Sequence, residues 1–169
     1  FIKKGSGLRG VPSGFSELDR KLAGFQDSNL IILAARPGIG KTTLALNMAL
    51  NVAVREKLSV GFFSLEMSKE ELVDRLLVGQ ADIDAWRLKT GRLSDSDYKK
   101  LTEAMGELSE APMFIDDTPG ISVLEMRTKA RKLKVEKNVK LLIVDYLQLA
   151  DAGRRFDSRV TEVSLISQS

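Results

Sequence analysis

The segment from residue 35 to residue 43 combines glycines, a lysine and two hydroxyl side chains in an order that suits phosphate binding. It reads Ala35, Arg36, Pro37, Gly38, Ile39, Gly40, Lys41, Thr42 and Thr43. Glycines 38 and 40 allow successive backbone N–H groups to curl round phosphate oxygens. A helix that begins near Lys41 directs its positive end at the same place. Lys41 can reach the β- and γ-phosphates, and Thr42 can offer its hydroxyl to Mg²⁺.

The segment matches the pattern G-x-x-x-x-G-K-[ST] except at its first position, where Ala35 replaces glycine. Alanine has the smallest side chain that carries a Cβ, so the turn can tolerate it. The alternative is a glycine-rich turn with an incidental lysine. An apolar run precedes the segment and a helical pattern follows it, which is the context that phosphate binding requires.

Two other apolar runs end in a carboxylate. Leu141–Val144 is followed by Asp145, and Phe62–Leu65 is followed by Glu66. Asp145 could hold Mg²⁺ beside the threonine hydroxyl, or it could cap the segment that follows. The phosphate loop in the same chain favours the metal role. Glu66 could orient and deprotonate an attacking water. It could equally stabilise the N-terminus of the next helix, and its position alone leaves both interpretations open.

Further charged residues have more ordinary interpretations. For Asp116 and Asp117, a role in the turn before Thr118 is favoured over metal binding. The basic residues between 127 and 140 lie mostly opposite an apolar stripe, as expected of a solvated helix face. Arg154, Arg155 and Arg159 lie in a segment that contains Gly153. They could grip a phosphodiester backbone, but exposed loops often carry arginine, and both interpretations remain open.

Alternating strands and helices must position these residues. Short apolar runs predict strands at 30–34, 60–64, 113–115 and 141–144. Helical patterns cover 16–22, 41–56, a segment opened by Ser68 with Glu71, 94–108 and 122–137. This alternation predicts an α/β fold with a mainly parallel sheet. Ligands of such sheets bind beyond the carboxyl ends of the strands, which is where the candidate residues stand.

Composition excludes several classes of site. The 169 residues include no cysteine and no histidine, so disulfides, thiolate or histidine zinc sites and histidine-dependent triads are excluded. The net charge of +3 permits contact with nucleic acid without arguing for it. No apolar run approaches the roughly 20 residues of a membrane span. The chain begins at Phe1 without Met and stops inside a helical pattern, so we expect both ends to be cut.

Several blocks of sequence resemble the C-terminal motor domain of bacterial replicative DNA helicases, the DnaB family. Alanine is also that family's usual residue at position 35. The blocks Ser64–Ser68 and Asp145–Leu149 are specific, since a generic P-loop protein would rarely carry both. The blocks that carry the resemblance are Gly10–Phe15, Glu17–Asp19, Ala34–Pro37, Gly40–Thr42, Phe63–Ser68, Ile115–Pro119, Asp145–Leu149 and Glu162–Ser164.

The resemblance implies a three-layer RecA-like P-loop NTPase with a mainly parallel β-sheet flanked by helices. Residues 1–15 would be a linker segment, and residues 16–169 would be an ATPase core that is incomplete at its C-terminal end. The implied cofactors are ATP and Mg²⁺. The implied partners are single-stranded DNA, further copies in a homohexameric ring, a primase and a helicase loader, with no membrane. The implied location is the bacterial cytoplasm, at the nucleoid.

Individual roles follow from the same resemblance. Glu66 would be the catalytic base, Lys41 would bind phosphate, and Thr42 and Asp145 would serve Mg²⁺. The arginines at 154, 155 and 159 would face DNA in the ring channel. The family's γ-phosphate-sensing glutamine, arginine finger and N-terminal helical domain lie outside this sequence. We therefore expect the fragment to hydrolyse ATP poorly, since an arginine finger can supply roughly 10³–10⁵ in rate.

Two other functions remain as alternatives. A RecA- or RadA-type recombination or repair ATPase shares the phosphate loop but should lack the Ser64–Ser68 block, and its repair branch often carries a four-cysteine zinc site. A nucleotide-dependent switch for helicase assembly would bind ATP without being a motor. Strand separation on a forked duplex distinguishes the motor from both.

Overall fold

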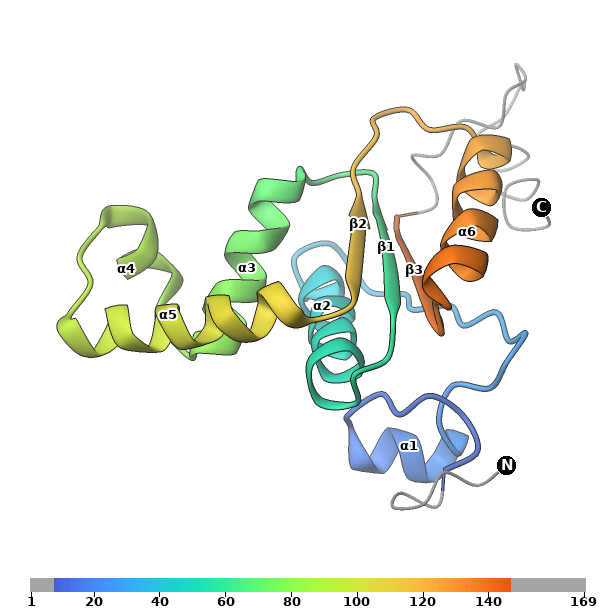
Figure 1. Ribbon diagram of the computed structural model, residues 1–169, viewed down its shortest axis with the longest axis horizontal. Helices are drawn as coiled ribbons and strands as arrows, with labels where there is room; N and C mark the ends of the chain where they lie inside the picture. Colours follow the sequence, from blue (N-terminus) through green and yellow to red (C-terminus); the bar gives the residue numbers. More distant parts are fainter. Residues whose placement is uncertain (1–7, 147–169) are drawn as a thin grey trace.

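The computed structural model describes residues 8–146, which form a three-stranded parallel sheet with helices around it (Figure 1). The strands lie in the order β2-β1-β3. The elements, in chain order, are α1 (Ser16–Leu22), α2 (Lys41–Leu50), the π-helical turn η1 (Asn51–Arg55), β1 (Val60–Ser64), α3 (Lys69–Ala81), α4 (Ala85–Thr90), α5 (Asp95–Glu110), β2 (Met113–Asp116), α6 (Val123–Lys137) and β3 (Leu141–Asp145).

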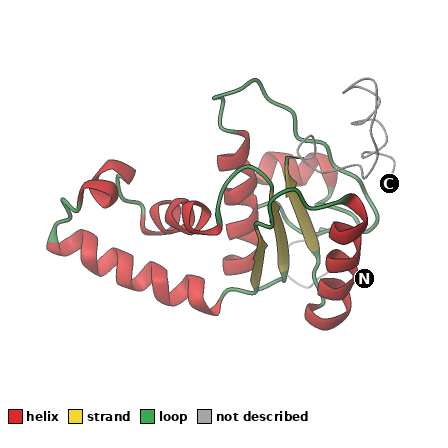
Figure 2. Ribbon diagram, turned by 90° about the horizontal axis from the view of Figure 1, so that it is seen from above, coloured by secondary structure: helices red, strands yellow, loops and turns green. Residues whose placement is uncertain are grey.

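Strand β1 is the centre of the sheet, and all five of its residues are buried. Its side chains alternate between the two faces, as in any strand. Phe62 packs into the core formed with α2 and α3, whereas Phe63 packs against Met126 of α6. Helices therefore cover both faces of the sheet, as Figure 2 shows. The predicted α/β fold with three layers is confirmed.

The absence of a side chain at Gly61 allows α6 to lie close to β1. A Cβ there would lie 2.9 Å from Leu142 Cδ1 and 3.4 Å from Leu133 Cδ1. Because such contacts are too close, any other residue would push the helix or β3 away. The apolar stripe predicted on this helix is confirmed: Val123, Met126, Ala130 and Leu133 all pack in the cluster around Phe63.

Local hydrogen bonds explain where the helices begin. Ser68 accepts a hydrogen bond from the backbone N–H of Glu71, and the Glu71 side chain accepts one in return. This is the predicted capping box. Ser94 and Asp97 form a second capping box at the start of α5. Ser122 caps α6, so the predicted starts of all three helices are confirmed.

The predicted strand at 30–34 is wrong. Residues 30–34 are exposed and belong to no strand, with Leu30 75% and Ile32 78% accessible. The apolar run has the composition of a buried strand, but a strand also needs a partner for its backbone N–H and C=O groups. Within residues 8–146 the sheet offers this segment no paired neighbour. Sequence pattern alone carries no information on that pairing.

The segment before α1 is fastened to the helical layer. Val11 forms an antiparallel bridge with Phe25, and both are buried. Asp19 Oδ1 accepts a hydrogen bond from the Ser13 N–H at 2.8 Å. The Asn51 side chain donates to the Ser13 carbonyl at 3.2 Å, which ties this segment to the C-terminal end of α2.

Helices α4 and α5, together with the C-terminal end of α3, form an arm that extends away from the sheet (Figure 1). Its own small core contains Ala81, Leu101 and Ala104. Helix α4 was not anticipated from the sequence, although Asp84 caps it and Gly91 ends it. No helix in the described part of the chain is long and apolar enough to cross a membrane.

Candidate nucleotide site

The loop between residues 35 and 40 is exposed and leads directly into α2. Gly38 and Gly40 have φ angles of 78° and 99°, a conformation that side chains with a Cβ rarely adopt. The Ile39 N–H donates to the Arg36 carbonyl at 3.3 Å, and this bond closes the turn. The two glycines are therefore required for backbone shape, and the predicted loop-to-helix arrangement is present.

Lys41 and Thr42, in the first turn of α2, both reach Asp145 at the end of β3. Lys41 Nζ lies 2.8 Å from Asp145 Oδ1. Thr42 Oγ1 donates a hydrogen bond of 2.5 Å to Asp145 Oδ2. Both oxygens of this 5% exposed carboxylate are thus engaged. The fold brings these three residues together from positions about a hundred residues apart in the chain.

These groups fit a magnesium–nucleotide complex. Mg²⁺ prefers oxygen ligands, and in nucleotide sites it is held by one or two protein groups together with phosphates and water. The Thr42 hydroxyl and the Asp145 carboxylate are such groups, and they already touch. Among residues 8–146 no group of three or more acids is placed to hold a metal ion by itself. One hydroxyl and one carboxylate suit a metal site that is completed by phosphates and water.

Glu66 lies two residues beyond β1, in the turn that leads to α3. Its carboxylate is exposed and has no hydrogen-bond or ion-pair partner among the residues that the structure describes. Glu66 lines a cleft of about 730 Å³ together with Thr42 and Thr43. Lys41, Asp145 and residues 35–40 are not part of that lining, so the cleft joins Glu66 to only one side of the phosphate loop.

The turn that carries Glu66 is fastened to its surroundings by its backbone. Ser64 Oγ donates to the Met67 carbonyl at 2.6 Å and accepts from the Met67 N–H at 3.3 Å. The Leu65 N–H donates to the Asp145 carbonyl at 2.7 Å. The hydrogen bonds at the N-terminus of α3 involve Ser68, Glu71 and Asp117, and Glu66 makes none of them. The alternative role of Glu66, a carboxylate favoured by the dipole of α3, needs no such bond and stays open.

Tyr146 is a site residue that the sequence did not reveal. Lys41 Nζ lies 4.3 Å from the centroid of its ring. A cation over an aromatic face is stabilised by the ring's quadrupole, so Tyr146 helps to hold the ammonium group. The signals in the sequence were its place directly after Asp145 and within the Asp145–Leu149 block.

Asp116 takes the turn role predicted for it and is also paired with α6. Its Oδ1 accepts from the Thr118 N–H at 3.1 Å, and Lys129 Nζ lies 2.8 Å from Oδ2. Burial raises the pKa of Asp116, but hydrogen bonds from Lys129 and Thr118 outweigh it and leave the pKa lowered. The same bond to Asp116 raises the pKa of Lys129.

The other basic residues of α6 agree with the predicted solvated face, since Arg127, Arg131, Lys132, Lys134 and Lys137 are exposed. Lys129 is the exception, because it is half-buried and paired. Arg154, Arg155 and Arg159 lie outside the described residues.

Comparison with known proteins agrees with this geometry. The family model described as "DnaB-like helicase C terminal domain" matches residues 10–169. The chain is 52% identical over 162 residues to the "Replicative DNA helicase DnaC" of Bacillus subtilis, covering 95% of this chain and 36% of that relative. It is 51% identical to the "Replicative DNA helicase DnaB" of Geobacillus stearothermophilus, covering 96% and 36%.

Two solved structures share the fold with a TM-score of 0.88 and 37% identity, each covering 95% of this chain. One is "The Structure Of A DnaB-Like Replicative Helicase And Its Interactions With Primase", of which 40% is covered. The other is "ATPase Domain of G40P", of which 58% is covered. The chain spans about a third of the length of the curated helicases above. With its phosphate loop, its paired acid and a match from residue 10 to residue 169, the chain belongs to the family of DnaB-like helicase C-terminal domains.

Proposed function

We propose that this chain is the ATPase motor domain of a replicative DNA helicase, which couples ATP hydrolysis to movement on single-stranded DNA and to strand separation. The observation that carries the proposal is the meeting of Lys41 and Thr42 with Asp145 at one edge of the sheet. Glu66, two residues beyond the neighbouring strand, has no partner among residues 8–146. The names of the similar helicases support the same function.

Each residue has a distinct task in this proposal. Magnesium-bound ATP supplies the phosphoanhydride bond whose cleavage drives the motor. The backbone N–H groups of residues 35–43 and the Lys41 ammonium bind its phosphates, since such donors stabilise negative charge. Thr42 and Asp145 hold the metal. Glu66 orients the attacking water and accepts its proton, for which a free carboxylate at the cleft is suited.

The proposed assembly is a homohexameric ring on single-stranded DNA at the bacterial nucleoid, with a helicase loader and a primase as partners. One of the similar solved structures is that of a DnaB-like replicative helicase and its interactions with primase. Arg154, Arg155 and Arg159 are the proposed DNA contacts. Charge reversal at Arg154 and Arg155 should weaken single-stranded DNA binding and lower its salt dependence. Reversal of the exposed Arg127 and Arg131 on α6 is the matched control.

Strand separation tests the function directly. The full-length protein should unwind a forked DNA duplex in the presence of ATP and Mg²⁺, whereas the Lys41→Ala variant should not. DNA-stimulated ATPase activity without unwinding would favour a recombination-type ATPase. Nucleotide binding without DNA-stimulated turnover would favour an assembly switch. Unchanged DNA affinity after reversal of Arg154 and Arg155 would remove these residues from the DNA site.

A further inference from the structure

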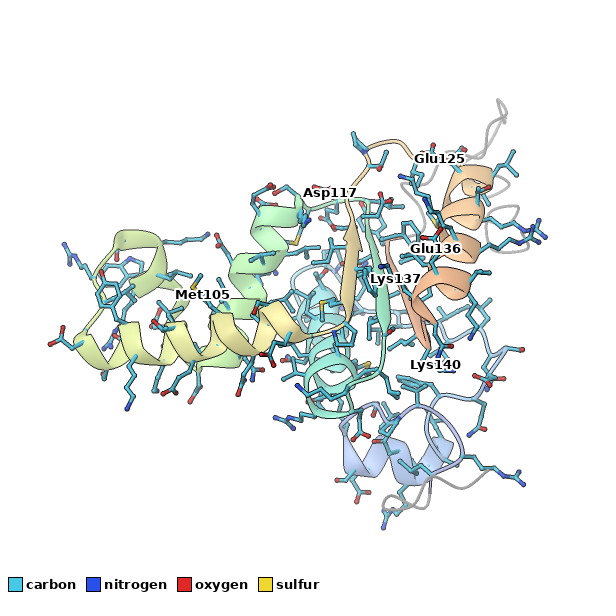
Figure 3. The ribbon with its side chains drawn as sticks, viewed as in Figure 1. Met105, Asp117, Glu125, Glu136, Lys137 and Lys140 are labelled. Carbon is cyan, nitrogen blue, oxygen red and sulfur yellow. The ribbon has the colours of Figure 1, made fainter. Side chains whose placement is uncertain are left out.

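The first backbone N–H of α3 is capped by a residue from a different part of the fold. The Lys69 N–H donates a 2.8 Å hydrogen bond to Asp117 Oδ2, across a separation of 48 residues. Asp117 follows β2 and lies beside the start of α3, as Figure 3 shows. A carboxylate at this end of a helix is favoured by both the hydrogen bond and the helix dipole.

This cap comes in addition to the local ones. The capping box of α3 uses Ser68 and Glu71, which satisfy each other's backbone N–H groups. The Lys69 N–H is left over, and Asp117 accepts from it. Because a local cap is already present, the contact with Asp117 is not needed to start the helix. It fixes the end of the Glu66 turn to the loop after β2.

The loop that presents Asp117 is itself held in place from the other side. Lys129 of α6 lies 2.8 Å from Asp116 Oδ2 and donates a 2.8 Å hydrogen bond to Thr118 Oγ1. The Thr118 N–H in turn donates to Asp116. The two adjacent carboxylates therefore bind different helices, Asp116 to α6 and Asp117 to α3. The loop that carries Asp117 is therefore held in place by α6.

Glu66 depends on these tethers because no residue between 8 and 146 bonds to its side chain. Before Glu66, the Leu65 N–H fixes the turn to β3. After Glu66, Ser64 Oγ holds the backbone of Met67, and the bond between Lys69 and Asp117 holds the end of the turn. A carboxylate without partners takes its position from the backbone that carries it. A displacement of about 1 Å in a reacting group can cost on the order of 10²-fold in rate.

We propose that Asp117 is a positioning residue for ATP hydrolysis, which acts by fixing the turn that carries Glu66. The proposal rests on the proposed role of Glu66 as the catalytic base. Asp117 does not touch the nucleotide in this scheme. Its loss should therefore lower kcat and leave nucleotide binding intact.

The test compares Asp117→Ala with Asp117→Asn in the full-length protein with single-stranded DNA. Alanine removes the acceptor and should lower kcat about tenfold, since one of several tethers is lost. The KM for ATP and the affinity for a fluorescent ATP analogue should change by less than about twofold. Asparagine keeps an oxygen acceptor and should restore most of the rate. Asp95→Ala, at an exposed first-turn position of α5, is the control.

A second arm uses the Glu66→Gln background. If Asp117 acts through Glu66, the Glu66→Gln and Glu66→Gln/Asp117→Ala proteins should have the same residual single-turnover rate. A further tenfold loss in the double variant would overturn the proposal. So would an unchanged kcat in Asp117→Ala, or a loss of nucleotide affinity and thermal stability that asparagine fails to restore. Normal hydrolysis by Glu66→Gln alone would instead refute the proposed role of Glu66.

Discussion

The carboxyl ends of β3 and β1 carry the same kind of residue in opposite environments. Asp145 is 5% exposed, and both of its oxygens bind side chains of α2. Glu66 is exposed and has no partner in the described part of the chain. The difference arises because β3 ends against the first turn of α2, whereas β1 runs into a turn that faces the cleft. A carboxylate whose oxygens are both bonded can hold charged neighbours in place. A carboxylate without partners is available to accept a proton.

Among the changes near these two carboxylates, replacement of Lys41 should have the largest effect on ATP turnover. Lys41→Ala removes the phosphate contact and leaves the buried Asp145 without its cation, so turnover should fall at least about 10³-fold. Binding of a fluorescent ATP analogue should weaken as well. Lys41→Arg, which keeps the charge but changes its geometry, should recover binding better than turnover. A normal ATPase rate in Lys41→Ala would contradict the phosphate-loop assignment.

Replacement of Glu66 should separate chemistry from binding. Glu66→Gln keeps the size of the side chain but cannot accept a proton, so hydrolysis should fall about 10²–10⁴-fold while ATP still binds. ATPase assays and nucleotide titration measure the two effects. Glu70→Gln, which neutralises an exposed acid in the first turn of α3, is the control and should be near normal. If Glu66→Gln loses binding too, Glu66 has a structural role.

The free energy of unfolding of the nucleotide-free protein should depend on Asp145 and not on Glu66. Asp145→Asn loses the ion pair with Lys41 and weakens the bond from Thr42, at a cost of about 1–2 kcal/mol. Thermal unfolding of the nucleotide-free full-length protein should therefore begin at a lower temperature. The Glu66→Gln protein should unfold as the unmodified one does. Equal midpoints for the two variants would remove the contrast between a bonded and a free acid.

The smallest effect is expected at Asp116, the last residue of the edge strand β2. Its folded-state pKa is lowered, so its stabilisation is present above the unfolded value of about 3.9 and is lost as pH falls below it. The pKa of Lys129 is raised, so its share persists up to the unfolded value of about 10.4 and is lost above it. Asp116→Asn should thus cost up to about 1 kcal/mol near pH 7 and much less near pH 2.

Chemical unfolding at both pH values measures this difference, with the exposed loop variant Asp27→Asn as the control. A cost that is the same at pH 7 and near pH 2 would mean that packing, and not charge, is what Asp116 contributes.

Local signals in the sequence were sufficient for most of the fold. The runs at 60–64, 113–115 and 141–144 became strands because each has a parallel neighbour in the sheet. Ser68 and Ser122 began helices because capping depends on residues within one turn. The run at 30–34 failed because strand formation depends on a partner that no local pattern specifies.

The place of the site could be predicted from the sequence, but the contacts between its side chains could not. That Lys41, Thr42 and Asp145 would share one edge of a parallel sheet follows from the strand–helix order. Their bonds to one another, and the ring of Tyr146 beside Lys41, depend on side-chain geometry that the sequence does not contain. The contact between Asp117 and Lys69 joins the loop after β2 to the first residue of α3, in a different βα unit, so it was not visible as a motif.

The central place of β1 has a consequence for how the chain acquires its structure. Val60 pairs with Met113 on one side and Leu141 on the other, so its second partner emerges from the ribosome about 80 residues later, or roughly 4–16 s at bacterial or eukaryotic synthesis speeds. Until then Phe62 and Phe63 lack much of their eventual cover, and contacts this distant in sequence slow folding. We expect the nascent chain to bind chaperones during that interval, since unpaired apolar strands are prone to aggregate.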